Sequence, residues 1–420
     1  MEDLKREYKL EGDFELRFEV GSRSGKVTLE LKSGLAEVFG TDLVKNQKYD
    51  FFPGSNIAVF SWQGCTLELE GTPHLAYIGR ETPMPIYLNC HAVLERVREL
   101  SEKEDSKGPV AMVVGPCDVG KSTICRLLAN YALRMSRTPF YVNLDVGQVE
   151  FAVPGTLGAL LLNTPTSVEE GFSQEDGPLV FHFGYDSPER NDTLYKHLIT
   201  RVAEVCNDRM KTNQKAKHSG IIINTCGWTQ KEGFRVLAHV AQAFEINAIL
   251  VINDEKLYND LHREMPHFVQ VVLLPKSAGV VKRDQTRRAE VRNSSIHKYF
   301  YGIPSSPLHP CKIKVKFDDV SIYKIGAPSF SSTSSSLSTR STNMTKLVPL
   351  RPIPEMRNHL LSVSFANSDE DDIVQSNVAG FLHVQDVNMQ EKILTLLSPQ
   401  PELKPNSILL LSEVKHCELH

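Results

Sequence analysis

A glycine-containing octapeptide is the first stretch of this sequence whose residue types and spacing could do chemistry. Residues Gly115 to Ser122 read GPCDVGKS and match the pattern GxxxxGK[ST] in full. Glycines in such a loop let successive backbone N–H groups surround a phosphate, and the helix that follows adds its dipole. The Lys121 ammonium would bridge the β- and γ-phosphates of a nucleotide, and the Ser122 hydroxyl would bind Mg²⁺. The octapeptide therefore predicts a nucleotide site.

An acidic residue follows the next apolar stretch along the chain. Phe140 to Leu144 is continuously apolar apart from one Asn, and Asp145 comes directly after it. In a fold of this kind, a carboxylate at the carboxyl end of a neighbouring strand holds Mg²⁺ or activates a nucleophile. An Asp at a strand end is also a common turn or cap residue. Beside the phosphate-binding loop, Asp145 is the best candidate for a catalytic carboxylate.

A tryptophan lies just past another predicted strand. The tetrapeptide Thr225-Cys226-Gly227-Trp228 follows the apolar stretch that ends at Ile223. Loops at the carboxyl ends of strands line the ligand crevice of open α/β sheets. Trp228 could stack on a base of single-stranded nucleic acid, or it could be a packing residue.

A basic segment, Lys276 to Lys298, holds seven Lys or Arg against two acids, a local net charge of +5. In P-loop kinases, a helical lid after the last strand supplies arginines that neutralise the transferring phosphoryl group. A solvated basic helix has the same composition. Both interpretations stay open at this point.

Positioning these side chains requires an open α/β sheet, and the apolar pattern predicts its strands. Continuous apolar stretches alternate with longer amphipathic ones, which is typical of a parallel sheet covered by helices. The stretches are Val110–Val114, Phe140–Leu144, Leu179–Phe183, Gly220–Ile223, Ala248–Ile252 and Val269–Leu274. The octapeptide lies between the first of them and a helical stretch at residues 123–135, which is the context that a phosphate-binding loop requires.

Short stretches with period-two alternation flank this region and predict two β-rich parts. We expect a small β-sandwich or barrel from about residue 15 to 78, a helix over 91–104, a linker at 101–108 and a β-rich region after residue 303. The predicted domains are therefore 1–100, 101–305 and 306–420. A Ser-rich insertion at 329–342 and an acidic run at 369–372 are predicted to be solvated loops.

Composition excludes several classes of protein. The 420 residues include 47 Lys plus Arg and 51 Asp plus Glu, so the net charge of -4 gives no overall attraction to nucleic acid. The 8 cysteines are scattered without a CxxC pair, which argues against a disulfide framework or structural zinc. With no apolar N-terminal stretch and no long apolar run, we expect a soluble protein of a reducing compartment that does not contact membranes.

The kind of nucleotide chemistry can be narrowed further. No Asn/Thr-Lys-x-Asp guanine reader occurs, which disfavours a regulatory G protein. The remaining classes are a small-substrate or polynucleotide kinase and an ATP-binding protein without catalysis.

These pieces, in this order, resemble the polyribonucleotide 5′-hydroxyl kinase family of messenger-RNA 3′-end cleavage (pre-mRNA cleavage complex II) and tRNA splicing. The matching stretches are Gly115–Thr123, Leu144–Gln148, Ile223–Trp228, Leu274–Val281, Lys298–Gly302, Phe39–Thr41, Thr82–Met84 and Lys324–Pro328. The resemblance implies a central P-loop kinase domain between two β domains. It also implies transfer of the γ-phosphate of ATP to the 5′-hydroxyl of RNA.

The resemblance also implies roles for individual residues. ATP would be bound by Gly115, Pro116, Cys117, Asp118, Val119, Gly120, Lys121, Ser122 and Thr123, and Mg²⁺ by Ser122 and Asp145. Asp145 would activate the 5′-hydroxyl or organise the metal. Arg283 and Arg288 would be lid arginines, and RNA would be held by Trp228, Thr225 and Gln148.

The N-terminal domain would contribute to adenine recognition through Glu15, with Asn56 at the position where the family often has a lysine. The resemblance further implies a nuclear protein with pre-mRNA cleavage factor and tRNA splicing endonuclease subunits as partners. Some family members keep bound ATP but lack kinase activity. We favour an active kinase because the loop, Asp145, Trp228 and the lid arginines are all present, and an inactive ATP-bound scaffold is the alternative.

Overall fold

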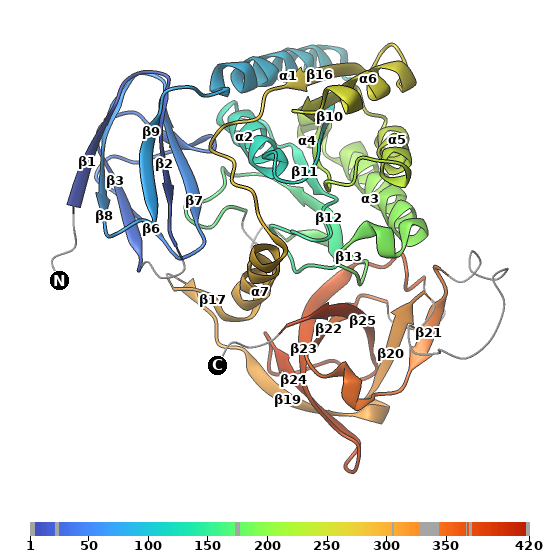
Figure 1. The fold of residues 1–420 in the computed structure, drawn as a ribbon. Coiled ribbons are helices and arrows are strands. Elements are labelled where there is room, and N and C mark those ends of the chain that lie inside the picture. The colour runs from blue at the N-terminus through green and yellow to red at the C-terminus, as the bar shows by residue number, and fades with distance from the viewer. Residues whose placement is uncertain are drawn as a thin grey trace. The chain divides into compact units, whose positions relative to one another are not determined.

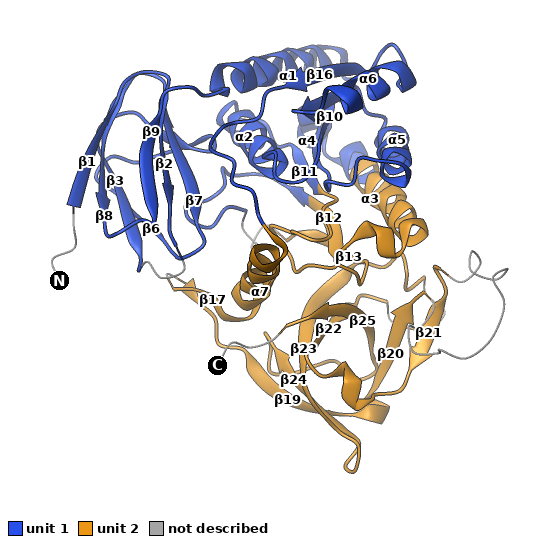
Figure 2. Ribbon diagram, in the orientation of Figure 1, with its two compact units in different colours: residues 1–142, 160–176, 208–283 blue, residues 143–159, 177–207, 284–420 orange. Residues whose placement is uncertain are grey.

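The computed structural model describes residues 5–21, 25–172, 177–304, 306–326, 344–366, 368 and 372–416. The Ser-rich insertion at 329–342 lies outside the described residues, as does the acidic run except Asp372. The chain divides into two compact units (Figure 2): unit 1 holds residues 1–142, 160–176 and 208–283, and unit 2 holds 143–159, 177–207 and 284–420. The domain boundaries after residues 100 and 305 stay predictions.

The N-terminal part of unit 1 consists of two β-sheets packed face to face, drawn in blue in Figure 1. Leu29 and Leu67 of the first sheet and Leu16 and Val59 of the second share one core and are fully buried. The first sheet has the order β1 (Lys5–Leu10), β8 (Cys65–Glu70), β3 (Val27–Gly34), β6 (Lys48–Phe51). The second has the order β5 (Thr41–Asp42), β4 (Glu37–Val38), β7 (Asn56–Ser61), β2 (Phe14–Glu19), β9 (Leu75–Gly79).

Unit 1 also contains the sheet that carries the phosphate-binding loop. Its strands run in the order β11 (Phe140–Asn143), β14 (Ile221–Asn224), β10 (Val110–Val114), β15 (Ala248–Ile252), β16 (Gln270–Leu274). β10 is parallel to both β14 and β15, and β15 is parallel to β16. The helices are α1 (Met84–Glu104), α2 (Lys121–Arg134), α4 (Gln214–Ser219), α5 (Glu232–Phe244) and α6 (Glu255–Glu264). The predicted parallel α/β arrangement is confirmed here.

The direction predicted for one strand was wrong. β13 (Leu179–His182) pairs antiparallel with β12 (Thr156–Leu161), a strand that the sequence pattern did not predict. A parallel pair needs a crossover connection, usually a helix, and the described residues 162–172 form none. An antiparallel pair needs no such crossover, which agrees with the observed direction.

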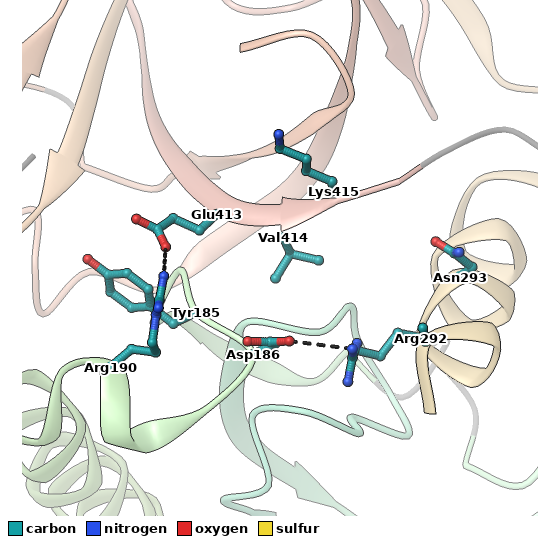
Figure 3. Close-up of a pocket in the computed structure, with 9 residues that line it drawn as sticks. Tyr185, Asp186, Arg190, Arg292, Asn293, Glu413, Val414 and Lys415 are labelled. Carbon is teal, nitrogen blue, oxygen red and sulfur yellow. Dashed lines mark hydrogen bonds and ion pairs between the residues drawn. The ribbon is translucent and has the colours of Figure 1, made fainter. Parts of the chain in front are cut away.

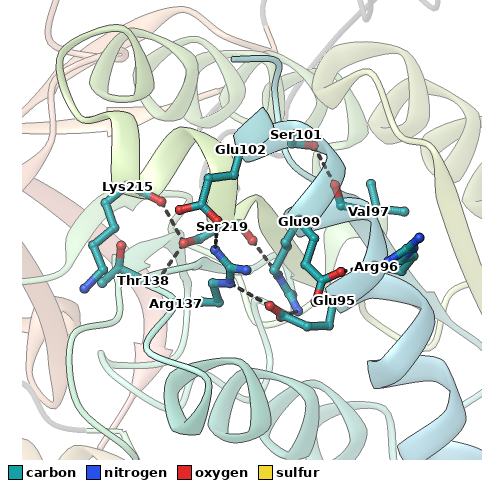
Figure 4. Close-up of polar contacts among 11 residues, drawn as sticks. Glu95, Arg96, Val97, Glu99, Ser101, Glu102, Arg137, Thr138, Lys215 and Ser219 are labelled. Carbon is teal, nitrogen blue, oxygen red and sulfur yellow. Dashed lines mark hydrogen bonds and ion pairs between the residues drawn. The ribbon is translucent and has the colours of Figure 1, made fainter. Parts of the chain in front are cut away.

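Helix α1 begins at Met84, seven residues before the predicted start at 91, and ends at Glu104 as predicted. A buried ion-pair network fixes its inner face (Figure 4). Arg98, only 1% exposed, donates to Glu95 at 3.2 Å and to the Ser219 carbonyl at 2.9 Å. Arg137, which lies just before β11, donates to the same Glu95 at 2.7 Å.

Unit 2 contains a second large sheet and confirms the predicted β-rich C-terminal region. The order is β19 (Cys311–Lys316), β24 (Ile393–Ser398), β23 (Val378–Asn388), β22 (His359–Ser364), β25 (Ser407–Lys415), β20 (Val320–Ile325), β21 (Leu347–Leu350). β20 and β25 are parallel, and the other described pairs are antiparallel.

The other elements of unit 2 are mostly short. They are η1 (Pro188–Arg190), most of α3 (Asp192–Thr212), α7 (Gln285–Tyr301), β17 (Gly302–Ile303), β18 (Ser306–Pro307), η2 (Phe317–Asp319) and η3 (Pro354–Met356). Among the described residues, no helix is both long and apolar enough to cross a membrane.

Candidate nucleotide site

The predicted phosphate-binding loop lies between β10 and α2, as its sequence context indicated. Both of its glycines have backbone angles that disfavour a side chain: φ is +151° at Gly115 and +92° at Gly120. A Cβ at Gly115 would also lie 2.9 Å from the Ile252 carbonyl oxygen. The end of β15 therefore confines the loop so closely that only glycine fits at its first position.

The side chain of Lys121 lies within this loop rather than in solvent. It is 7% exposed, and its ammonium donates a hydrogen bond to the Pro116 carbonyl at 2.8 Å. A buried ammonium needs strong acceptors. Phosphate oxygens are better acceptors than one carbonyl, so an entering nucleotide would draw Lys121 away from Pro116.

Ser122 has a partner that sequence reasoning missed. Asn224, fully buried at the end of β14, donates from Nδ2 to the Ser122 Oγ at 3.0 Å. A hydroxyl oxygen has two lone pairs, so the second remains for a metal ion. The available signal was a polar residue that ends the apolar stretch Ile221–Ile223.

The residues present fit Mg²⁺ better than a metal held by protein ligands alone. Among the described residues, no group of three or more His, Cys, Asp or Glu could hold a metal ion. Mg²⁺ commonly uses one or two protein oxygens together with nucleotide phosphates and water. The Ser122 hydroxyl would serve as such a ligand.

The segment that contains Trp228 packs directly against the phosphate-binding loop. A Cβ at Gly227 would lie 2.7 Å from the Cys117 backbone nitrogen and in contact with its Sγ. Thr225 is 2% exposed, and its hydroxyl donates to the Val113 carbonyl at 2.8 Å. Trp228 itself is partly exposed. The structure thus places Trp228 near the loop and gives the Thr225 side chain a structural partner.

The first part of the basic segment 276–298, which is the predicted lid, lies beside the same loop. The Arg283 backbone N–H donates to the Asp118 carboxylate at 3.0 Å. A Cβ at Gly120 would lie 3.0 Å from a methyl group of Val280. Residues 280–283 therefore lie against the phosphate-binding loop, and the partly exposed Arg283 side chain begins there.

Glu15, predicted to contact adenine, is buried on β2 and forms an ion pair with Arg17. Thr82 donates to the other carboxylate oxygen at 3.3 Å. Burial lowers the pKa of Arg17, but the Tyr77 and Glu15 partners outweigh it and leave that pKa raised. A Cβ at Gly279 would lie 2.9 Å from the Arg17 Nε, so this pair adjoins the lid segment.

Asn56 is not brought to Glu15. In the β2–β7 register Asn56 is opposite Glu19, whereas Glu15 is opposite Phe60. Four residues of extended strand separate the two positions by about 13 Å. The Asn56 amide donates to the Gly54 carbonyl at 3.3 Å, so it belongs to its own turn.

Helix α2 is anchored to the N-terminal sheets behind the loop. Glu37, 2% exposed, accepts hydrogen bonds from Tyr131 and, at 2.7 Å, from Arg134. Gly40 has φ +86°, and a Cβ there would lie 2.9 Å from the Cβ of Asn130. These contacts explain the Phe39–Thr41 stretch, whose glycine permits close approach to the helix.

Asp145 lies in unit 2 and organises a turn. Its Oδ1 accepts from the backbone N–H groups of Gly147 and Gln148 at 3.0 and 3.2 Å. Its own N–H donates to the Asn143 side chain at 3.0 Å. Gln148 and Arg288 also belong to unit 2, whereas Lys121, Trp228 and Arg283 belong to unit 1. Convergence of the two groups stays a prediction.

A phosphate-binding loop between a parallel strand and a helix defines the class of P-loop nucleotide-binding proteins, and ATP binding is implied. Three family models match: the N-terminal beta-sandwich domain of polyadenylation factor at residues 9–101, the P-loop of mRNA cleavage and polyadenylation factor CLP1 at 115–302, and pre-mRNA cleavage complex II protein Clp1 at 308–418. The chain belongs to the Clp1 family, which confirms the predicted resemblance.

Similar proteins cover the whole chain. A protein CLP1 homolog of Aedes aegypti is 51% identical over 416 residues, 99% of this chain and 98% of the relative. The polyribonucleotide 5′-hydroxyl-kinase Clp1 of Gallus gallus is 47% identical over 413 residues, 98% of this chain and 96% of the relative. A chain of a solved Clp1p–Pcf11p complex is 23% identical to this protein. The match covers 100% of this chain and 100% of that chain with a TM-score of 0.85, which shows a shared fold.

Proposed function

We propose that this protein is an ATP-dependent polyribonucleotide 5′-hydroxyl kinase that acts in messenger-RNA 3′-end processing and tRNA splicing. The observation that carries the proposal is the complete phosphate-binding loop, with Lys121 buried inside it and Ser122 oriented by Asn224. The chain is also 47% identical to the chicken protein that bears this kinase name. Phosphoryl transfer depends mainly on such positioned charges.

In the proposed reaction, the 5′-hydroxyl oxygen of RNA attacks the γ-phosphorus of ATP. The new P–O bond forms as the bond to the β-phosphate oxygen breaks, and ADP leaves. Lys121 holds the β- and γ-phosphates, and Asp145 orients the hydroxyl and accepts its proton. Mg²⁺, bound at Ser122 and Asp145, would neutralise charge on the β- and γ-phosphates. Arg283 and Arg288 would close over the γ-phosphate.

The RNA end would be held near the Trp228 segment. Trp228 is partly exposed and packs beside the loop, which supports stacking on the terminal base. Gln148 would contact RNA from the Asp145 turn. The Thr225 hydroxyl is already bonded to Val113, so its contribution would come from the backbone.

Family membership also supports a proposal about partners and location. Two solved structures with the same fold are of Clp1p with Pcf11p, and one matched family model describes a pre-mRNA cleavage complex protein. We propose cleavage factor subunits and tRNA splicing endonuclease subunits as partners and the nucleus as the place of action. Glu15 would face adenine, with Asn56 outside its immediate surroundings.

Two variants test the assigned roles. We expect Asp145→Asn to keep ATP affinity and to lower single-turnover transfer to a 5′-hydroxyl RNA by at least about 100-fold, the usual weight of a positioned acid–base group. Lys121→Ala should lose transfer and weaken ATP binding together. Asp260→Asn, in an exposed ion pair with Arg263, is the matched control. Unchanged transfer in Asp145→Asn would remove Asp145 from the mechanism.

Chain length tests the substrate class. A kinase that stacks the terminal base on Trp228 should phosphorylate an oligonucleotide well and a free nucleoside poorly. Equal rates on both would indicate a small-molecule kinase. ATP binding without transfer to any 5′-hydroxyl acceptor would indicate a scaffold.

A further inference from the structure

A polar pocket in unit 2 is not used by the mechanism above. Its volume is about 210 Å³, and its lining includes Asp186, Arg190, Arg292, Glu413 and Lys415 (Figure 3). These side chains come from three segments: helix α7, strand β25 and residues 186–190 after β13, which end in η1. A liquid water molecule occupies ~30 Å³, so the pocket would hold about seven of them or one hydrated anion.

Cations outnumber carboxylates in this pocket. Glu413 accepts from Arg190 at 2.8 Å and from the buried Lys324 at 2.7 Å, so one carboxylate is shared between two cations. Asp186 pairs with Arg292 at a longer 3.5 Å. Within the described part of the chain, no carboxylate lies within 4.0 Å of the exposed Lys415 ammonium. The excess positive charge suits an anionic ligand.

The pocket adjoins the turn that holds Asp145. The Asp186 carbonyl lies against Gly147, where a Cβ would be 2.9 Å from that oxygen. The N–H of Gly147 in turn donates to Asp145 at 3.0 Å. On α7, Arg292 follows Arg288 by four residues, so the two arginines lie on the same face of the helix.

We propose that this pocket binds a phosphodiester of the RNA strand, downstream of the 5′-terminal nucleotide. This proposal rests on the proposed function, because the Asp145 turn would hold the 5′-hydroxyl. A phosphate would replace Asp186 as the partner of Arg292 and take the second donor face of Arg190. Such contacts fix the register of the strand without reading its sequence.

The test pairs a protein variant with a change in the RNA backbone. Arg190→Gln is the variant of choice, because Glu413 keeps its ion pair with Lys324 and no carboxylate is stranded. The probe is a fluorescent 5′-hydroxyl RNA hexamer in which each linkage in turn is an uncharged methylphosphonate. Arg357→Gln, an exposed arginine of the same unit, is the control. Binding is measured by anisotropy without turnover, so a missing kinase activity would leave this test intact.

We expect Arg190→Gln to raise the Kd of the native hexamer about tenfold, the weight of one charge-assisted hydrogen bond, and Arg190→Lys to raise it less. One methylphosphonate linkage should raise the Kd equally in the wild type and have no further effect in Arg190→Gln. Additive effects at every linkage would overturn the proposal. An unchanged Kd for RNA in Arg190→Gln, the result expected of a pocket that takes an acidic partner peptide, would also overturn the proposal.

Discussion

At the residue scale, the phosphate-binding loop depends on close approaches that only glycine permits. Gly227 packs on the Cys117 backbone, and a Cβ at residue 227 would displace the Cys117 backbone. We expect Gly227→Ala to raise the Kd for ATP roughly tenfold, because overpacking typically costs ~1–3 kcal/mol and here would distort the loop. Calorimetric titration with ATP measures this effect.

Gly25→Ala is the matched control for that substitution. A Cβ at Gly25 meets nothing within 4 Å, so ATP affinity should not change. An ATP Kd in Gly227→Ala equal to that of the control would show that the Trp228 segment does not support the loop.

Local sequence was enough to predict some of these residues and not others. Lys121 and Ser122 belong to a contiguous pattern whose geometry is fixed by a strand, a loop and a helix. Asn224 and Glu37 act on partners about a hundred residues away, at Ser122 and Tyr131. No periodicity in one sequence reports such pairs, so they required the fold.

At the element scale, helix α1 depends on a buried pair of charges. Removing Glu95 would leave Arg98 almost fully buried without a carboxylate and would also deprive Arg137 of a partner. We expect Glu95→Ala to lower the free energy of unfolding of unit 1 by about 3–5 kcal/mol, the typical cost of breaking a buried pair. Urea unfolding measures the loss.

Glu99→Ala on the same helix is the control. Its pair with Arg96 is largely exposed, so the expected loss is below about 1 kcal/mol. Equal losses in Glu95→Ala and Glu99→Ala would show that the buried network contributes no more than a surface pair.

Strands that are buried on both faces were predicted well, whereas strand β12, whose sequence is rich in turn residues, was not predicted. β10 and β15 are continuous apolar runs and were predicted with their observed bounds. β12 follows Pro154 and Gly155 and contains Gly158, so its sequence is typical of a loop. Because β12 was not predicted, the antiparallel direction of its partner β13 could not be predicted either.

At the scale of the whole molecule, buried histidines in both units link stability to pH. Burial lowers the pKa of His182 to about 3 in unit 2, and burial with the nearby Arg98 lowers that of His91 to about 4 in unit 1. The unfolded chain takes up these protons below about pH 6.5, and the folded chain does not. Stability is therefore full above pH 6.5 and falls as pH decreases toward 4.

We expect each histidine to remove about 2 kcal/mol between pH 7 and pH 5. Urea unfolding at both pH values measures this loss, and His182→Gln should reduce the pH dependence of unit 2. Substitution of the exposed His267 is the control. A pH dependence that His182→Gln leaves unchanged would assign the acid sensitivity of unit 2 to other groups.

Charge at this scale agrees with a protein that binds one RNA end. The net charge is -4. Positive charge is in excess only locally, as in the basic segment at 276–298 and in the polar pocket of unit 2 that contains Arg190. A protein that coats long RNA would need basic surface throughout.

The most direct test of the proposed kinase activity is the transfer of labelled γ-phosphate from ATP to RNA. Purified protein is incubated with γ-labelled ATP, Mg²⁺ and an RNA oligonucleotide that has a 5′-hydroxyl, beside the same RNA with a 5′-phosphate. We predict label on the 5′-hydroxyl RNA only, removable by a phosphatase. Bound ATP with no label on either RNA would contradict the kinase and leave a nucleotide-bound scaffold.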